Sequence, residues 1–326
     1  MYEAHTRPHD RLLLGHGDRL SVTWRHNYDI LASTDQPPRG RTVITDKPFE
    51  KGYVKKLMHE HEEILPGHGL HVEKMPGHWL LAQMGKRVLR PGGLALTRRM
   101  LDALNIAPTD RVVEFAPGLG VTAQLVLAKS PSSYTAVEAD DAAARRVQGY
   151  LSGDNQRCVV GQAEHSGLPD GVATVVYCEA MLSMKTPEHK AKIIQEATRL
   201  LTPGGRCGIH ELALVPDDID STTRDAINRA LSQSIHVGVR PMTVPEWKTL
   251  LQREGLTVKA EATAPMHLLE PSEMIRNEGL AGMARIAWNV LQNPAARQRI
   301  HAMRRVFRQY DRNMAALMLV AEKGNS

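Results

Sequence analysis

The residues best suited to chemistry surround a pair of glycines in the first half of the sequence. Glu114 ends a short β-branched segment, Gly118 and Gly120 follow it, and helical spacing of apolar residues begins at Val121. Glycine has no Cβ, so the backbone can turn tightly there and approach a ligand closely. A strand that enters a helix through two glycines is typical of a nucleotide-binding turn. The alternative is an ordinary turn between a strand and a helix.

Two nucleotides fit this turn, and one acidic residue distinguishes them. The spacing Gly118-x-Gly120-x-x-Ala123, with Glu138 20 residues after Gly118, agrees with the fingerprint of dinucleotide-binding proteins. A dinucleotide would place a pyrophosphate beside Glu114, and the two negative charges would repel each other. S-adenosylmethionine would place an ammonium and a sulfonium there, which a carboxylate attracts. Glu114 therefore favours S-adenosylmethionine, and an NAD(P)-dependent oxidoreductase remains the alternative.

Further ionisable residues lie in or at the ends of predicted buried strands. Glu179 follows one such segment, and His210-Glu211 lies inside the next. Ligands of an open parallel sheet bind beyond the carboxyl ends of its strands, so Glu179, His210 and Glu211 are candidates for catalysis. Strand alternation places His210 and Glu211 on opposite faces, so at most one of them faces an acceptor. The alternative is a buried, hydrogen-bonded histidine beside a structural glutamate, with Glu179 as a helix-capping acid.

Composition limits the class of protein. The chain has 326 residues, 42% of them hydrophobic, which is enough for one large domain and an extension. The net charge is only +5 and aromatic residues make up 4%, which argues against a nucleic-acid surface. Three scattered cysteines without a CxxC motif are typical of a reducing compartment, so we expect a cytoplasmic protein. We expect neither a signal peptide nor a membrane span.

The N-terminal third is rich in histidine. His59, His61, His68, His71 and His78 fall within 20 residues of one another. Their spacing matches no standard zinc pattern, and residues two apart on a helix do not face each other. We therefore expect no metal site there.

Helical and strand patterns alternate after about residue 88, which predicts βαβ units and a parallel sheet covered on both faces. A strand is predicted through Val112 and Val113, and further strands over 134–137, 158–160, 174–178, 206–214, 257–262 and 314–321. Helices are predicted over 51–65, 77–89, 94–104, 141–151, 186–201, 217–238, 244–255 and 270–308, the last broken near Asn293-Pro294. We expect an N-terminal extension, 1–88, that is partly helical and covers the cofactor mouth, and a cofactor-binding domain, 89–326.

The order of motifs resembles the class I S-adenosylmethionine-dependent methyltransferases over about 240 residues. The motifs are Val113-Glu114-Phe115-Ala116-Pro117-Gly118-Leu119-Gly120, Ala136-Val137-Glu138, Gly161-Gln162-Ala163-Glu164 and Leu201-Thr202-Pro203-Gly204-Gly205-Arg206. The chain looks most like the small-molecule branch that includes quinone C-methyltransferases and cyclopropane-fatty-acid and sterol methyltransferases. This resemblance implies an α/β Rossmann-like, doubly wound sheet of seven strands in the order 3-2-1-4-5-7-6, with the seventh antiparallel.

The resemblance also implies roles for single residues. Glu114 would lie near the methionine ammonium, the backbone around Gly118 and Gly120 would contact the cofactor, and Glu138 would accept hydrogen bonds from the ribose hydroxyls. Gln162, before Ala163, would accept from the adenine amino group. Glu179 would lie near the methionine moiety or the methyl group.

Two positions depart from the family pattern. Ala116 stands where the family has its first glycine, which is tolerable if the backbone there keeps a negative φ. Gln162 stands where the family has Asp, and its amide oxygen can still accept a hydrogen bond.

The resemblance implies an acceptor pocket built by insertions near the N-terminus and between the last two strands. We predict a helical lid over 265–310. The apolar residues that suggest a lining or lid are Met266, Leu268, Leu269, Met274, Met283 and Trp288. The alternative is a place in the core, which is more common for Met and Trp at helical spacing than a place in a substrate pocket. The expected reaction is methyl transfer to a small, partly apolar molecule, with the methylated O, C, N or S atom left open.

Other functions remain open from the sequence. A non-catalytic S-adenosylmethionine-binding protein would use the same fold. No Asn/Asp-Pro-Pro-Tyr/Phe motif follows residue 178, so a nucleic-acid substrate is not expected. The oligomeric state is left open, with a homodimer as one option.

Overall fold

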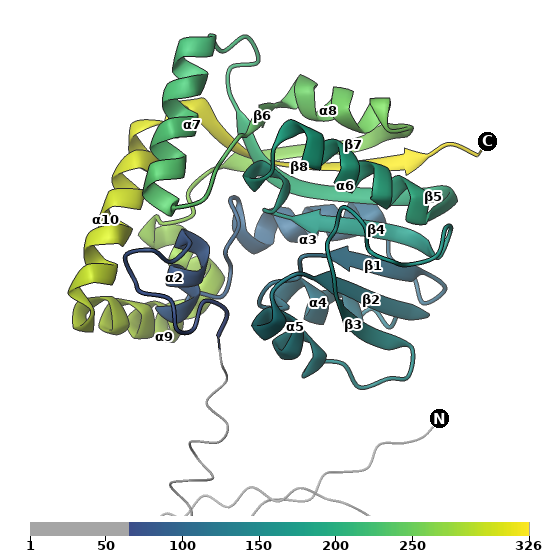
Figure 1. Ribbon diagram of the computed structural model, residues 1–326, viewed down its shortest axis with the longest axis horizontal. Coiled ribbons are helices and arrows are strands. Elements are labelled where there is room, and N and C mark those ends of the chain that lie inside the picture. The colour runs from purple at the N-terminus through teal and green to yellow at the C-terminus, as the bar shows by residue number, and fades with distance from the viewer. Residues whose placement is uncertain (1–64, 326) are drawn as a thin grey trace, which may run out of the picture. The chain divides into compact units, whose positions relative to one another are not determined.

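The structure is a computed structural model, and it describes residues 65–325 (Figure 1). The predicted helix at 51–65, apart from its last residue, lies outside the described residues. The same holds for His59 and His61 and for most of the predicted N-terminal extension.

One mixed sheet organises the described residues. Its strands are β1 (Arg111–Phe115), β2 (Ser133–Glu138), β3 (Gln156–Val160), β4 (Ala173–Glu179), β5 (Leu201–Leu214), β6 (Met242–Thr243), β7 (Leu256–Pro265) and β8 (Met314–Lys323). They lie in the order β3-β2-β1-β4-β5-β8-β7, and the two-residue β6 pairs with β5. Only β8 runs antiparallel to its neighbours. The predicted fold and strand order are confirmed, because β7 and β8 are the sixth and seventh long strands; β6 was not predicted.

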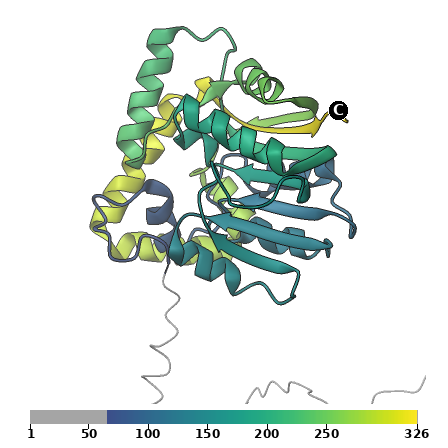
Figure 2. The same ribbon diagram turned by 45° about the vertical axis from the view of Figure 1, so that its right-hand side comes forward.

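Helices cover both faces of the sheet, as Figures 1 and 2 show. The helices of the described residues are α2 (Gly77–Gln83), α3 (Gly93–Leu104), α4 (Val121–Leu127), α5 (Asp141–Gln148), α6 (Pro187–Leu200), α7 (Ser221–Ile235), α8 (Val244–Arg253), α9 (Pro271–Gln292) and α10 (Pro294–Gln309), with a 3₁₀ turn, η1 (Leu182–Met184). Buried apolar residues of α6 and α8 pack on one face, and those of α3, α4 and α5 pack on the other. This is the doubly wound arrangement that the alternating pattern predicted.

A third apolar cluster lies beyond the carboxyl ends of the strands. It joins α2, α7 and α10 to the ends of β5 and β8, with Leu81, Leu214, Leu231, Met303 and Met314 among its buried members. The helices that contribute to it come from segments before and after the central strands. This cluster therefore forms one wall at the edge of the sheet where ligands of such folds bind.

Two predicted boundaries differ in informative ways. The helix predicted over 77–89 ends at Gln83, since Gly85 adopts a φ of 98° and the backbone N–H groups of Arg87 and Val88 donate to Glu278 of α9, both at 3.0 Å. Strand β5 begins at Leu201 instead of 206, because Leu201 already pairs with Ala173 of β4 across an irregularity in the register. In both cases, a partner distant in the sequence sets the boundary.

Candidate active site

A cavity of about 510 Å³ opens at the carboxyl ends of β1, β2, β4 and β5. Its volume lies within the usual range of small-molecule sites. Ala116 to Leu119 line it from the glycine turn, and α2, α7 and α10 contribute the opposite wall. The cavity thus joins a polar end, at the strand termini, to an apolar end, at the third cluster.

The glycine turn begins directly after the last residue of β1, Phe115. The N–H of Ala116 still donates to the carbonyl of Val137 at 2.9 Å, and Ala116, Gly118 and Gly120 then have φ values of 52°, 56° and 71°. The negative φ under which alanine would be tolerated without strain is therefore not present, because the chain must reverse direction directly after its last ladder bond. A left-handed conformation costs a residue with a Cβ roughly 1–2 kcal/mol. A Cβ on Gly120 would lie 2.8 Å from the ring of Tyr150, so this position requires glycine.

Glu114 is buried at the base of this turn and faces the cavity. Tyr134 and Tyr177 both donate from their hydroxyls to the same carboxylate oxygen, Oε2, the second at 2.6 Å. Burial raises the pKa of Glu114 to about 7, although the two phenols oppose the shift. Oε1 is left as the oxygen that can accept from a ligand. A cationic group in the cavity would favour the ionised form.

Glu138 ends β2 and also faces the cavity. Its Oε2 accepts from the N–H of Gly118 and its Oε1 from the N–H of Asp140, both at 3.0 Å. These two bonds fix the carboxylate, and each oxygen keeps a second acceptor position. The arrangement suits a pair of neighbouring hydroxyl donors.

Gln162 and Ala163 lie just after β3 at the same edge and line the cavity. Ala163 is buried, whereas Gln162 is exposed and forms an isolated bridge with His165. The Gln162 side chain is therefore open to a ligand or to solvent.

Glu179 ends β4 inside a buried polar group. Its Oε1 accepts from the Thr97 hydroxyl at 2.6 Å and lies 2.9 Å from Nδ1 of His210, while its Oε2 accepts from the Thr122 hydroxyl. The Arg90 Nη1 lies 3.3 Å from Oε2. Burial alone would raise the pKa of Glu179, but the Arg90 charge and these hydrogen bonds outweigh it and hold the pKa at about 2. Glu179 is thus an anion held by several partners.

Arg90 is the site residue that sequence reasoning missed. It lines the cavity with 9% of its surface exposed, and its Nε and Nη2 are buried without a hydrogen-bond partner. Such unsatisfied donors are costly, and a carboxylate ligand would satisfy them. The sequence signal for it was an arginine directly before Pro91-Gly92-Gly93.

His210 and Glu211 are both completely buried. The Nε2 of His210 lies 2.6 Å from the carbonyl oxygen of Pro91 and its Nδ1 faces Glu179, so neither nitrogen presents a lone pair to the cavity. His210 does not line the cavity, whereas Glu211 does. The two side chains point away from each other, as alternation predicts.

The Glu211 carboxylate closes the turn that follows β4. Its Oε1 accepts from the N–H groups of Met181 and Leu182 at 2.9 and 2.7 Å, and its Oε2 accepts from the N–H and hydroxyl of Ser183 at 3.1 and 2.8 Å. Four donors thus occupy one carboxylate. Little capacity remains for a ligand proton.

Helix α2 lies over the glycine turn. A Cβ on Gly118 would lie 3.9 Å from the ring of Trp79, and His78 and Trp79 both line the cavity. Burial lowers the pKa of His78 to about 4, so this imidazole is neutral at pH 7. The segment just before residue 88 therefore reaches the polar end of the cavity.

Only part of the predicted apolar lining faces the cavity. Met266 and Leu268 line it, and α10 adds Met303 and Phe307. Leu269 and Met274 are buried away from it. Trp288 is largely exposed on the outside of α9, and Met283 is half-buried. None of these four side chains lines the cavity, and the core alternative holds for Leu269 and Met274. Helix α9 turns its buried side, with Glu278 and Ile286, toward the segment 84–94.

Comparison with known proteins identifies the family. The methyltransferase domain family matches residues 113–209, the segment from β1 to β5. An uncharacterized protein of Haemophilus influenzae is 31% identical over 220 residues, which cover 66% of this chain and 86% of that protein. The chain belongs to the class I S-adenosylmethionine-dependent methyltransferases. Family membership therefore decides between the two nucleotides in favour of S-adenosylmethionine.

Solved structures share the methyltransferase fold at low sequence identity. A putative sarcosine dimethylglycine methyltransferase from Galdieria sulphuraria is 14% identical, with a TM-score of 0.54 over 71% of this chain and 84% of that one. Phosphoethanolamine N-methyltransferase 2 of Haemonchus contortus is 13% identical, with a TM-score of 0.57 over 76% and 57%. The [4+2]-cyclase SpnF is 17% identical, with a TM-score of 0.54 over 71% and 81%. At these identities the likeness is one of fold.

The residues of this methyltransferase fit its cofactor on their own chemistry. Opposite charges of a bound amino acid would meet the Glu114 carboxyl and the unsatisfied nitrogens of Arg90, while Glu138 offers acceptors to a ribose.

Among residues 65–325, no helix is long and apolar enough to cross a membrane. No group of three or more metal-binding side chains occurs within that same range.

Proposed function

We propose that this methyltransferase methylates a small, largely apolar acceptor bound at the end of the cavity opposite the glycine turn. The observation that carries this proposal is the lining of that end, which belongs to the third apolar cluster. It includes Leu231 of α7, Met266 after β7, and Met303 and Phe307 of α10. An acceptor that buried a charge against these side chains would lose its hydration without gaining a partner.

The polar end is assigned to S-adenosylmethionine. Glu138 accepts from the ribose hydroxyls, Gln162 and the backbone at Ala163 contact the adenine, and the backbone at Ala116, Gly118 and Gly120 follows the methionine chain. Support comes from the position of these residues at adjoining strand ends around one cavity. In this proposal α2, with the rest of the described extension before residue 88, covers the ribose side and excludes water.

Glu114 and Arg90 would hold the methionine zwitterion. The Oε1 of Glu114 would accept from the ammonium, and the unsatisfied nitrogens of Arg90 would donate to the carboxylate. Glu179 has a supporting role, because its ion pair with Arg90 holds the guanidinium beside the cavity. The cofactor itself supplies a methyl group on a sulfonium, which needs no further activation.

The protein's contribution to the reaction is then mainly geometric. An in-line displacement requires the acceptor atom, the methyl group and the sulfur to be aligned, and holding them so can supply most of the rate enhancement. The glycine turn and Arg90 fix the donor, and the apolar wall orients the acceptor. Because both ends of the cavity would be covered, water would be excluded as a competing nucleophile.

No protein base is assigned to the acceptor. Glu211 already accepts from four donors, and both nitrogens of His210 face acceptors. We therefore propose that these two predicted catalytic residues have a structural role and take no proton from the acceptor. This favours an acceptor atom that reacts without transferring a proton to the enzyme in the same step. A thiolate or a tertiary amine meets that condition.

The decisive experiment measures turnover of radiolabelled S-adenosylmethionine with paired acceptors of similar size. Apolar thiols and tertiary amines are compared with the corresponding acids and sugars. We expect transfer to an apolar acceptor, and expect Met303→Asp to reduce it while leaving the affinity for S-adenosylhomocysteine unchanged. Transfer only to the acids or sugars would contradict the proposal, and cofactor binding without turnover on any acceptor would favour a non-catalytic cofactor-binding protein.

A further inference from the structure

The outer side of α9 carries an apolar stripe that packs against nothing in the described part of the chain. Leu280, Trp288 and Leu291 are 74%, 63% and 60% exposed, and the exposed Ala284 and Ala287 lie between them. Spacings of three and four residues place all five on one side of the helix. Large exposed apolar side chains that adjoin one another mark an interaction surface more often than isolated ones do.

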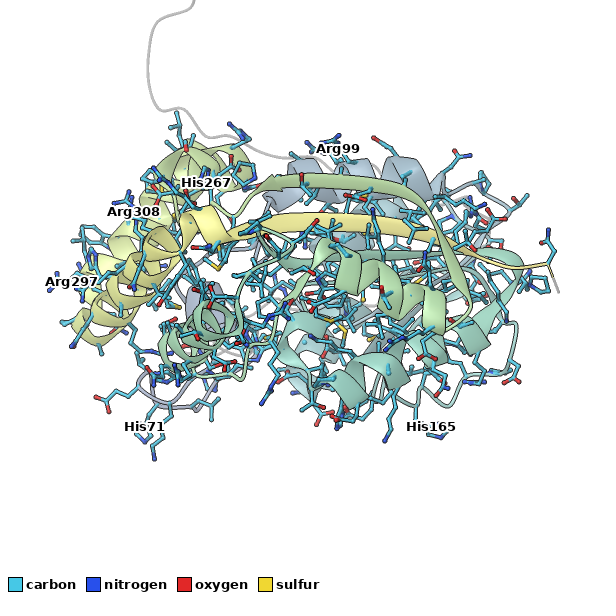
Figure 3. The ribbon with its side chains drawn as sticks, turned by 90° about the horizontal axis from the view of Figure 1, so that it is seen from above. His71, Arg99, His165, His267, Arg297 and Arg308 are labelled. Atoms are coloured by element: carbon cyan, nitrogen blue, oxygen red, sulfur yellow. The ribbon has the colours of Figure 1, made fainter. Side chains whose placement is uncertain are left out.

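The next helix presents a basic stripe. Arg297, His301, Arg305 and Arg308 are exposed at spacings of four, four and three residues along α10. Pro294–Gln309 contains five arginines and no acidic residue. Figure 3 shows Arg297 and Arg308 at the outer edge of the molecule, beyond the sheet.

Neighbouring acids compensate this charge only in part. Glu270 accepts from both Arg304 and Arg308, and Asp311 lies 3.4 Å from Nε2 of His267. Arg297 and Arg305 have no ion pair within the described residues. The stripe therefore keeps a net positive charge at its exposed surface.

We propose that the outer faces of α9 and α10 dock on a lipid bilayer that contains anionic phospholipids. The arginines would meet the headgroup phosphates, and Trp288 and the two leucines would enter the boundary between headgroups and acyl chains, where tryptophan is favoured. Because only one side of each helix is exposed in this way, the binding is interfacial, and no segment needs to cross the bilayer. This proposal does not depend on the identity of the acceptor.

The position of α10 gives this surface a consequence for the enzyme. The inner side of the helix lines the apolar end of the cavity with Met303 and Phe307, while its outer side carries the arginines. A helix with its side chains is about 10–12 Å across. A bilayer bound at the outer side would thus lie within about one helix diameter of the apolar end of the cavity.

Two other partners fit less well. Double-stranded nucleic acid would match the arginines but would leave Leu280, Trp288 and Leu291 without an apolar partner. A second copy of the chain, joined by a two-fold axis at this patch, would bring each basic stripe against its own copy, since such interfaces are self-complementary. An anionic bilayer provides negatively charged headgroups for the arginines and an apolar layer for Leu280, Trp288 and Leu291.

Sedimentation of the full chain with vesicles tests the proposal. We expect binding to vesicles of phosphatidylcholine with phosphatidylglycerol, little binding to phosphatidylcholine alone, and weakening in 0.5 M salt, which screens the attraction. Arg297→Glu/Arg305→Glu should reduce partitioning at least about twenty-fold, since one arginine near an anionic surface contributes roughly five-fold. Trp288→Ala should weaken binding but preserve its salt dependence.

A matched control separates this surface from general positive charge. Arg157→Glu/Arg253→Glu makes the same change in net charge at two exposed positions on β3 and α8, and it should bind as the unmodified chain does. Equal loss in both double variants would overturn the proposal, as would no binding by the unmodified chain. If duplex DNA bound tightly and only the α10 variant lost this binding, nucleic acid would replace the bilayer as the partner. If light scattering showed a dimer that Trp288→Ala dissociates, the partner would be a second copy of the chain.

Discussion

The carboxylate of Glu179 and the guanidinium of Arg90 form a buried ion pair, 3.3 Å apart, that leaves two nitrogens of Arg90 unsatisfied. The carboxylate is in turn held by two threonine hydroxyls and His210. When a neighbour holds a charged group in place but leaves some of its hydrogen-bond donors without a partner, the group can bind a ligand of opposite charge.

Arg90→Ala should weaken binding of S-adenosylhomocysteine about 10- to 100-fold, the usual range for hydrogen bonds to a charged group. Titration calorimetry measures the change. Arg90→Lys keeps the charge beside Glu179 but loses the forked donors, so it should recover only part of the affinity. 5′-Methylthioadenosine, which lacks the amino acid, should bind the variants and the unmodified enzyme equally; if its affinity falls by the same factor, Arg90 acts on the fold and not on the carboxylate.

Cofactor affinity should rise with pH between 6 and 8. Burial raises the pKa of Glu114 to about 7, so the free enzyme holds a proton below that pH, and the ligand ammonium favours its release. At pH 7 about half a proton should be released per cofactor bound, measured by calorimetry in buffers of different ionisation enthalpy. Affinity should fall toward lower pH by up to about tenfold per unit.

Glu114→Gln is the control for this linkage. It should remove the proton release and leave an affinity that hardly changes between pH 6 and 8, at a lower level than that of the unmodified enzyme at pH 8. A variant that still releases a proton on binding would assign the linkage to another group.

Ala116→Gly should stabilise the free protein. Ala116 has a φ of 52°, and a residue with a Cβ is strained there, so glycine should raise the free energy of unfolding by about 0.5–1 kcal/mol. Urea unfolding measures the difference. Ala103→Gly, in the ordinary helical conformation of α3, should instead lower stability by about 1 kcal/mol. A loss of stability in both variants would show that the Ala116 methyl group packs well enough to outweigh the strain.

Glu211→Gln should destabilise the fold by about 2–4 kcal/mol. The glutamine NH₂ group would face backbone N–H donors that now share the carboxylate, and these donors would be left buried without an acceptor. Glu254→Gln, at the half-buried C-cap of α8, should change stability by less than about 0.5 kcal/mol. If Glu211→Gln folds normally but shifts the pH profile of methyl transfer, the residue is a base and our structural assignment is wrong.

Much of the cofactor end was predictable because it depends on local patterns. Glu114, Gly118 and Glu138 occupy positions that strand ends and tight turns dictate, and all three line the cavity. The conformation of Ala116 was not predictable from the sequence, since a residue's φ at a chain reversal depends on its last ladder partner, here Val137. Arg90 was overlooked because a loop arginine acquires meaning only beside the distant Glu179.

Helices α9 and α10 also show what a local pattern can predict and what it cannot. The 3.6-residue period predicted helices between β7 and β8, and α9 and α10 confirm them. The period did not reveal which apolar side chains face the cavity, because α9 carries such residues on its inner and outer sides. Contacts of α9 with the segment 84–94 placed Trp288 outside.

The sequence by itself determined the alternation of helices and strands and the glycine turn, because each depends on residues that are neighbours along the chain, and its linked motifs indicated the strand order and the class of cofactor through the family resemblance. Only the tertiary structure decided which ionisable groups are available for binding or chemistry. His210 meets a carbonyl 119 residues away, and Glu211 is saturated by a turn about 30 residues earlier. A carboxylate or imidazole can act on a ligand only if its hydrogen-bonding capacity is not already used, and packing alone sets that.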